Sequence, residues 1–221
     1  MSFNKGFTMG SPSKNQSESN GKLSKSEIND LPIRKWEGPI NLIDSDAQMV
    51  DAVLQLRNEQ VIGFDVETRP AFKKGVSYRP SLIQMAGTDY VNIFQLTRLS
   101  EYSALVDLLS DQNILKVGVG LVNDTQHLQS VFAFQPKKLL DLSEVTRRAG
   151  IESYGLRSLS AHFLGFRISK RAQCSNWDNK ELRPFQISYA ATDAWVSREI
   201  YLAMQQQGLL PAQAVQPLIP S

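Results

Sequence analysis

Hydrophobic and polar positions along the middle of the chain alternate between two periods, one typical of strands and one of helices. Apolar runs predict strands over residues 39–43, 61–68, 81–87, 90–96, 114–120 and 138–142. Apolar residues at helical spacing predict helices over 46–58, 101–110, 124–132, 157–164 and 186–206. A two-residue turn at 88–89 makes 81–96 a hairpin, and the later strands alternate with helices. This order predicts an α/β domain with a mixed sheet flanked by helices.

The two ends of the chain have a different composition from the middle. Residues 1–36 are rich in Ser, Asn, Lys and Gly near the start, and we expect a disordered N-terminal tail there. Residues 209–221 contain three prolines and no charge and are expected to be a C-terminal tail. One folded domain is predicted over 37–208. Within it, residues 167–182, here called the irregular segment, show no clear hydrophobic period, which is typical of a functional or mobile segment.

Composition excludes several kinds of site. The chain has 221 residues, of which 42% are hydrophobic and 21% charged, as in soluble globular proteins. Its single cysteine excludes an internal disulfide and a cysteine-cluster zinc site. No apolar run approaches the roughly 18 residues of a membrane span, and no signal peptide is evident, so an intracellular location is expected: cytoplasmic, or nuclear in a eukaryote.

Net charge gives little support for general nucleic-acid binding. The formal net charge is +2. Residues 1–38 account for all of it, with six cations against four anions, so the remainder of the chain is formally neutral. Any contact with nucleic acid must therefore depend on where cations are placed locally.

Two carboxylates stand at the end of the strand predicted over 61–68. Side chains alternate between the faces of a strand, so Asp65 and Glu67 share one face. The preceding residues look buried on both sides, and desolvating two acids there is costly unless a positive charge meets them. The simpler interpretation is that both acids reach water at the strand end.

Two further acidic positions border the same predicted sheet. Asp124 follows a glycine-containing strand end, where it could also be an ordinary helix N-cap. Tyr189 and Asp193 are four residues apart, hence on one helical face, which turns apolar further along the helix. Asp193 could instead be an acid favoured by the helix dipole. Each simple interpretation is plausible singly, but together they leave four carboxylates converging without cations. Such a set of oxygen ligands suits Mg²⁺ or Mn²⁺.

Three short motifs in this order resemble those of a known superfamily. FDVET (64–68), GVGLVNDTQHL (118–128) and YAATDA (189–194) are similar to the three exonuclease motifs of the DEDD superfamily. The blocks ETRPAFKKG, LIQMA and CSNWDNKELRPFQISYAATDA narrow the resemblance to the 3′–5′ exonuclease domain of the Werner-syndrome helicase family and its stand-alone relatives, over about residues 38–206. The spacing YxxxD indicates the tyrosine subclass. The resemblance implies a ribonuclease H-like fold.

The resemblance also implies a mechanism and roles for five residues. Hydrolysis of a phosphodiester bond at a 3′ end would use two divalent cations, Mg²⁺ or Mn²⁺, and release a nucleoside 5′-monophosphate. Asp65 would bridge the ions, Glu67 and Asp193 would complete the site of the ion that activates water, and Asp124 would support the other. Tyr189 has an ordinary pKa near 10 and would hold the attacking water rather than act as its base.

Substrate contacts are expected from cations near aromatic residues. The candidates follow the first motif or lie in the irregular segment: Lys73, Lys74, Arg79, Lys170 and Arg171. Basic residues beside aromatic rings suit phosphate contacts combined with base stacking. The simpler interpretation for each is a solvated loop charge.

Several alternatives remain open on the sequence. The expected substrate is a single-stranded or recessed 3′ end, with DNA favoured because ribonuclease D-like proteins usually add C-terminal helical domains. RNA 3′-end trimming, degradation of short oligonucleotides, and a catalytically silent nucleic-acid-binding module are the alternatives. A helicase is a candidate partner, no membrane partner is expected, and the sequence does not determine the oligomeric state.

Overall fold

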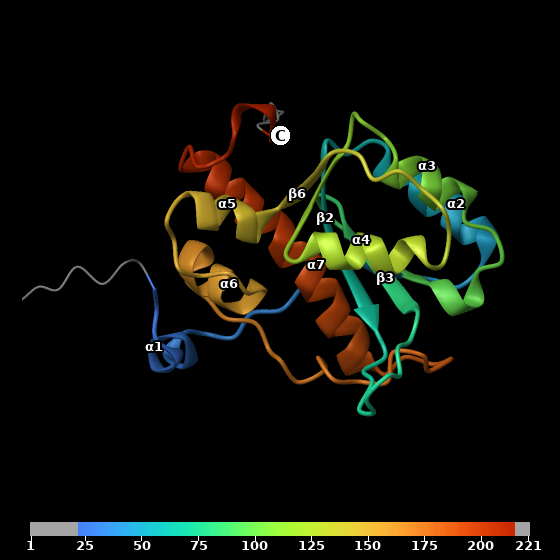
Figure 1. Cartoon of the computed structure of the whole chain (residues 1–221), viewed down its shortest axis with the longest axis horizontal. Helices are drawn as coiled ribbons and strands as arrows, with labels where there is room; N and C mark the ends of the chain where they lie inside the picture. The colour runs from blue at the N-terminus through green and yellow to red at the C-terminus, as the bar shows by residue number, and fades with distance from the viewer. Residues whose placement is uncertain (1–21, 215–221) are drawn as a thin grey trace, which may run out of the picture.

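One six-stranded mixed sheet organises the molecule (Figure 1). The structure is a computed structural model that describes residues 22–214. Its strands are β1 (Ile40–Ile43), β2 (Val61–Thr68), β3 (Pro80–Ala86), β4 (Val91–Gln95), β5 (Leu115–Gly118) and β6 (Leu139–Asp141). Their order across the sheet is β1-β4-β3-β2-β5-β6. The pairs of β3 with β2 and with β4 are antiparallel and the other three are parallel, which confirms the mixed sheet and the hairpin.

Helices cover both faces of the sheet. The main helices are α1 (Lys25–Asp30), α2 (Asp46–Leu56), α3 (Ser103–Leu109), α4 (Leu121–Gln129), α5 (Leu142–Arg148), α6 (Leu156–Leu164) and α7 (Pro184–Gln206). Short 3₁₀ turns occupy Leu96–Arg98 and Ala212–Ala214. Apolar residues of α2, α3 and α4 pack against one face, where Ile62 and Phe64 of β2 are fully buried. Residues of α5, α6 and α7 pack against the other.

The long helix α7 approaches the centre of the sheet unusually closely. A Cβ atom added to Gly63 of β2 would lie 2.0 Å from the backbone oxygen of Ala194 in α7. Ala190, Ala191 and Ala194 are fully buried against this face, so small residues on the helix and a glycine on the strand together permit the contact. The closeness brings the polar residues of α7 to the carboxylates at the end of β2.

The structure differs from the predicted elements in three places. Helix α4 begins at Leu121, three residues before the predicted start, because Gly120 takes a left-handed φ of 82° as its N-cap. Helix α5 was not predicted, since it spans only two turns and follows directly on β6. Residues 25–30, expected to be disordered, form α1. A reciprocal capping box between Ser24 and Glu27 pairs backbone N–H groups at the start of this helix.

The expected tails are thus shorter than predicted where the structure describes them. Residues 31–36 continue from α1 along the domain and contact α7. At the other end, the hydroxyl of Tyr201 donates a hydrogen bond of 2.8 Å to the carbonyl of Ala214, which is buried. Residues 1–21 and 215–221 of the expected tails lie outside the described residues.

Among the helices of residues 22–214, none combines the length and the apolar character that crossing a membrane requires.

Candidate active site

Three carboxylates from two elements meet at the end of β2. Asp65 and Glu67 lie on the face of β2 that α7 covers, and Asp193 comes from α7 itself. One carboxylate oxygen of each lies within 4.8 Å of the others. Asp193 is buried and the two β2 acids are half-buried. Three of the four acids that the sequence places at one edge of the sheet therefore lie together in the structure.

Burial and mutual repulsion disfavour the charged forms of these acids. Desolvation, followed by the charge of Asp193, raises the pKa of Asp65 well above its ordinary value. Desolvation and the charges of the neighbouring acids raise the pKa of Glu67 to about 10. Desolvation raises the pKa of Asp193 to about 7, and a hydrogen bond with the Tyr189 hydroxyl opposes part of this rise. No cation of residues 22–214 is among the groups that shift these three pKa values, so a bound positive charge would stabilise the charged forms.

Asp124 stands beside this group rather than within it. Desolvation and the charge of Asp65 raise its pKa to about 8, and its own charge in turn acts on Glu67. It lies in the first turn of α4, with Gly120 as the N-cap, so the interpretation of Asp124 as an N-cap was wrong.

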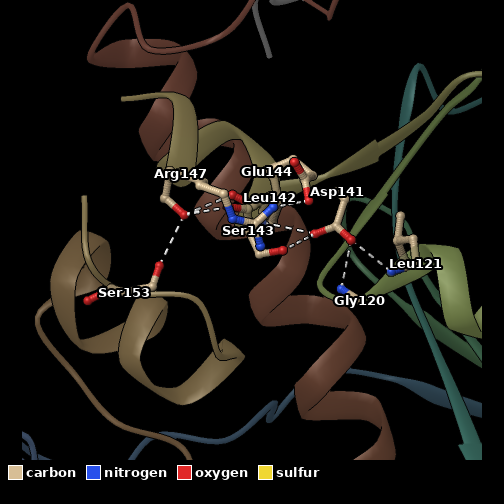
Figure 2. A network of polar contacts seen from close by, with 9 residues as sticks. Gly120, Leu121, Asp141, Leu142, Ser143, Glu144, Arg147 and Ser153 are labelled. Atoms are coloured by element: carbon tan, nitrogen blue, oxygen red, sulfur yellow. Dashed lines mark hydrogen bonds and ion pairs between the residues drawn. The ribbon is translucent and has the colours of Figure 1, made fainter. Parts of the chain in front are cut away.

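Another aspartate, Asp141, positions the turn that carries Asp124. One carboxylate oxygen of Asp141 accepts hydrogen bonds of 3.0 Å from the backbone N–H groups of Gly120 and Leu121. Its other oxygen accepts from the N–H and the hydroxyl of Ser143 (Figure 2). Asp141 thus ties the start of α4 to the start of α5, and supplies the capping that Gly120 cannot provide.

Tyr189 lies one helical turn before Asp193 and faces the carboxylates. Desolvation and the charge of Asp193 raise its pKa above the ordinary value, so the hydroxyl keeps its proton at neutral pH. The ring of Trp177 packs against it, with ring centroids 6.0 Å apart. Trp177 is only 1% exposed, so it anchors the irregular segment and fixes the tyrosine in place.

The donor set suits a hard divalent cation. The groups that converge are three carboxylates and the phenol of Tyr189, so all the donor atoms are oxygens. The Oδ1 atom of Asp193 is buried and has no hydrogen-bond partner among residues 22–214. An unpaired buried carboxylate oxygen is costly, and a bound cation would remove both that cost and the repulsion between the acids. The residues present therefore fit Mg²⁺ or Mn²⁺.

The structure distributes the predicted substrate-binding cations unevenly. Lys170 lines one cavity and Arg171 lines another. Tyr189 and Asp193 line both. Lys73 lines a third cavity together with Cys174, whose thiol influences the pKa of Glu67.

The other two predicted cations line none of these three cavities. Lys74 is exposed on the loop after β2. Arg79 acts on the pKa of Tyr102, which packs with α2 and α3 on the opposite face of the sheet. A binding role for Lys73, Lys74 and Arg79 stays a prediction.

Several residues around the site were not identified from the sequence. Lys25, Arg34 and Lys35 lie in the segment expected to be disordered, and Arg157 in a helix with no motif, yet all four line the cavities next to Tyr189. Asp141 accepts hydrogen bonds from backbone N–H groups of α4, and Gly63 permits the close approach of a backbone carbonyl of α7. Both roles depend on contacts between distant segments, so the sequence alone did not reveal them. A capping box at residues 24–27 was the one available signal that the N-terminal segment was ordered.

Comparison with known proteins identifies the family. A family model described as 3′-5′ exonuclease matches residues 40–208. The exonuclease mut-7 homolog of Homo sapiens is 33% identical over 82% of this chain and 24% of its own length. The bifunctional 3′-5′ exonuclease/ATP-dependent helicase WRN of Mus musculus is 30% identical over 84% of this chain and 14% of its own. Ribonuclease D of Haemophilus influenzae is 23% identical over 79% and 44%.

A solved structure agrees with these matches. The EXO domain of Nibbler from Aedes aegypti superposes with a TM-score of 0.71 and 26% identity, over 80% of this chain and 91% of that one. This likeness confirms the ribonuclease H-like fold. The chain spans less than half the length of the three relatives above.

The matched residues 40–208 contain the whole carboxylate cluster, Asp124 and Tyr189. The sequence motifs, the geometry and the family model agree, and the chain belongs to the 3′-5′ exonuclease family.

Proposed function

We propose that this chain removes nucleotides one at a time from the 3′ end of a nucleic acid, by hydrolysing phosphodiester bonds with the help of divalent cations. The observation that carries the proposal is the meeting of Asp65, Glu67 and Asp193 within 4.8 Å beside a protonated tyrosine. Family membership supports the reaction class.

The roles of the residues follow from their chemistry. Asp65, Glu67 and Asp193 would hold the cations, and Asp124, at the edge of the group, would hold one directly or through water. When bound, Mg²⁺ or Mn²⁺ would polarise the phosphodiester and make water a better nucleophile. Tyr189, which keeps its proton, would orient the attacking water by hydrogen bonding to it.

The choice between Mg²⁺ and Mn²⁺ is open to experiment. Both are octahedral cations that prefer carboxylate and water oxygens. We propose a pair of them, because a single divalent charge would leave four neighbouring carboxylates with net negative charge.

Single-stranded or recessed DNA is the substrate we favour, with RNA as the alternative. The relative named a ribonuclease is the least similar of the three compared, at 23% identity, against 30% for the one that joins an exonuclease to a helicase. The WRN relative, whose name joins an exonuclease to a helicase, also supports a helicase as a candidate partner.

The test is cleavage of matched substrates labelled at the 5′ end: single-stranded DNA, recessed duplex DNA and single-stranded RNA, each with Mg²⁺, Mn²⁺ or EDTA. We expect a ladder that shortens by one nucleotide at a time, nucleoside 5′-monophosphate as product, and no reaction in EDTA. Asp65→Ala should abolish cleavage while the fold survives. Asp51→Ala, which removes an exposed carboxylate from α2, is the matched control.

Two results would contradict the proposal. One is metal-dependent cleavage that persists in full in Asp65→Ala. The other is binding of these oligonucleotides without cleavage under any of the metal conditions, which would indicate the silent binding module instead.

A further inference from the structure

Residues 22–36, here called the N-terminal arm, are fastened to the face of the domain that carries the active site. The guanidinium of Arg157 in α6 donates a hydrogen bond of 2.8 Å to the side chain of Asn29. Further along, Ile33 forms a parallel β-bridge with Arg167. Figure 1 shows the arm running from α1 past α6 towards α7. The arm is therefore part of the folded domain.

The end of the arm reaches α7 next to a site carboxylate. The backbone N–H of Trp36 donates a hydrogen bond of 3.0 Å to the hydroxyl of Thr192, the residue before Asp193. The indole of Trp36 packs on that of Trp195, with ring centroids 5.7 Å apart. These contacts fix the side chains just before Trp36 close to the catalytic helix.

A cavity of about 330 Å³ lies between the arm, α6 and the irregular segment. Lys25 of the arm, Arg157 of α6 and Lys170 of the irregular segment all line it. Tyr189 and Asp193 form part of the same lining, so the cavity opens beside the proposed reaction centre. It also includes the first turn of α6, where the N-cap is a glycine without a capping side chain.

A second cavity, of about 360 Å³, shares Tyr189 and Asp193 of its lining with the first. Arg34 and Lys35 of the arm and Arg171 of the irregular segment line it. The guanidinium of Arg171 lies 5.8 Å from the ring centroid of Phe185, and this phenylalanine, 39% exposed, lines the cavity as well. An aromatic face beside cations suits an unpaired base next to its phosphates.

The charge of both cavities favours an anionic ligand. Among the residues that the structure describes, each lining contains three cations, and Asp193 is the only carboxylate residue in either. None of these six cations forms an ion pair with another residue in the range 22–214. Cations without a carboxylate partner in this described part of the chain are available to phosphates.

We propose that the N-terminal arm forms one wall of the substrate site, where Lys25, Arg34 and Lys35 bind phosphates of a single-stranded nucleic acid in the two cavities that Tyr189 and Asp193 line. This inference rests on the proposed exonuclease function and specifies part of its binding surface. A nucleic-acid chain is preferred to a free anion because two separate cationic cavities share the tyrosine and the aspartate of one reaction centre, so both can hold phosphates of one chain.

The test compares the salt dependence of binding in three versions of the full chain. The arm variant is Lys25→Ala/Arg34→Ala/Lys35→Ala. The control variant, Arg57→Ala/Lys137→Ala/Arg148→Ala, removes three exposed cations that line neither cavity. Binding of a 5′-labelled single-stranded oligonucleotide is followed by fluorescence anisotropy in EDTA, where no cleavage is expected, between 50 and 200 mM salt.

Each phosphate contact contributes about 0.7 to the slope of log K against log salt for single strands. Loss of three contacts should therefore lower the slope by about 2, so wild type would lose about 16-fold more affinity than the arm variant over this fourfold range of salt. The control variant should keep the wild-type slope. Thermal unfolding checks that each variant folds, and Lys25→Gln and Arg34→Gln singly replace the triple variant if it does not.

Two outcomes would overturn the inference. The arm variant could keep the wild-type slope, or inorganic phosphate alone could bind wild type and lose that binding in the arm variant while the oligonucleotide slope is unchanged. The second result would assign the cavities to a free anion. Cleavage by wild type in Mg²⁺ or Mn²⁺ is measured separately, so failure of the exonuclease proposal is distinguishable from failure of this one.

Discussion

Replacing Gly63 by alanine should separate α7 from the sheet and damage the active site from a distance. The added Cβ would lie 2.0 Å from the backbone oxygen of Ala194 and 3.0 Å from its carbonyl carbon. Ordinary Cβ contacts begin at 3.4 Å, so the helix must retreat by about 1.4 Å or the strand must bend. The obstacle is backbone, so no change of side-chain rotamer relieves it.

Two effects of different size follow from that displacement. Overpacking of a closely packed core costs about 1–3 kcal/mol of unfolding free energy, and the fully buried surroundings of Gly63 place the cost in the upper part of that range. Asp193 directly precedes Ala194 and would move with it. Since a misplacement of about 1 Å at a reacting centre can cost about a hundredfold in rate, we expect a loss of that order in kcat at a temperature where the variant is folded.

Urea unfolding and cleavage of labelled single-stranded DNA measure these two effects. Gly155→Ala is the control for stability, because its Cβ would meet only the Ser158 hydroxyl, at 3.8 Å. We expect only the smaller cost of placing alanine at the N-cap of α6 for the control, and a larger loss for Gly63→Ala. Wild-type stability together with wild-type kcat in Gly63→Ala would show that the helix does not need this closeness.

Three further predictions concern single groups. Tyr189→Phe should lower kcat by about a hundredfold, measured on labelled DNA, while the ring contact with Trp177 preserves the unfolding midpoint. Burial raises the pKa of Glu67 to about 10 and that of Asp124 to about 8, so in EDTA the folded chain holds protons that the unfolded chain releases. Unfolding free energy should therefore fall as pH rises from about 5 to about 9, by up to about 1.4 kcal/mol per pH unit per group, and added Mn²⁺ should oppose the fall in thermal denaturation. Lys116→Met removes the hydrogen bonds from a buried ammonium to the carbonyls of Leu108 and Asp111, which should cost about 1–3 kcal/mol in urea unfolding and leave kcat unchanged, because those carbonyls lie on the opposite face of the sheet from the carboxylates.

Local patterns were sufficient for the strands and for the acids of the site. The period of β2 places Asp65 and Glu67 on one face whatever the rest of the fold does, and the helical spacing of Tyr189 and Asp193 is equally local. Short elements were harder: α5 spans seven residues and carries no periodic signal long enough to separate it from a loop.

The surroundings of the site depend on contacts between distant segments. Asp141 and Gly120 are 21 residues apart, and nothing in either segment indicates that a carboxylate of one caps the helix that follows the other. The N-terminal segment likewise depends on distant contacts. Its polar composition indicates disorder, whereas hydrogen bonds to α6 and α7 hold it in place.

The sequence by itself therefore determined the kind of chemistry, since the identity and local spacing of acidic residues fix which ligands a site can offer and which face each one occupies. Only the tertiary structure decided how close α7 lies to β2, which cations surround the tyrosine, and that residues 22–36 belong to the domain. The physical reason is that periodicity acts over a few residues, whereas these features arise from close packing and hydrogen bonds between segments far apart in the chain.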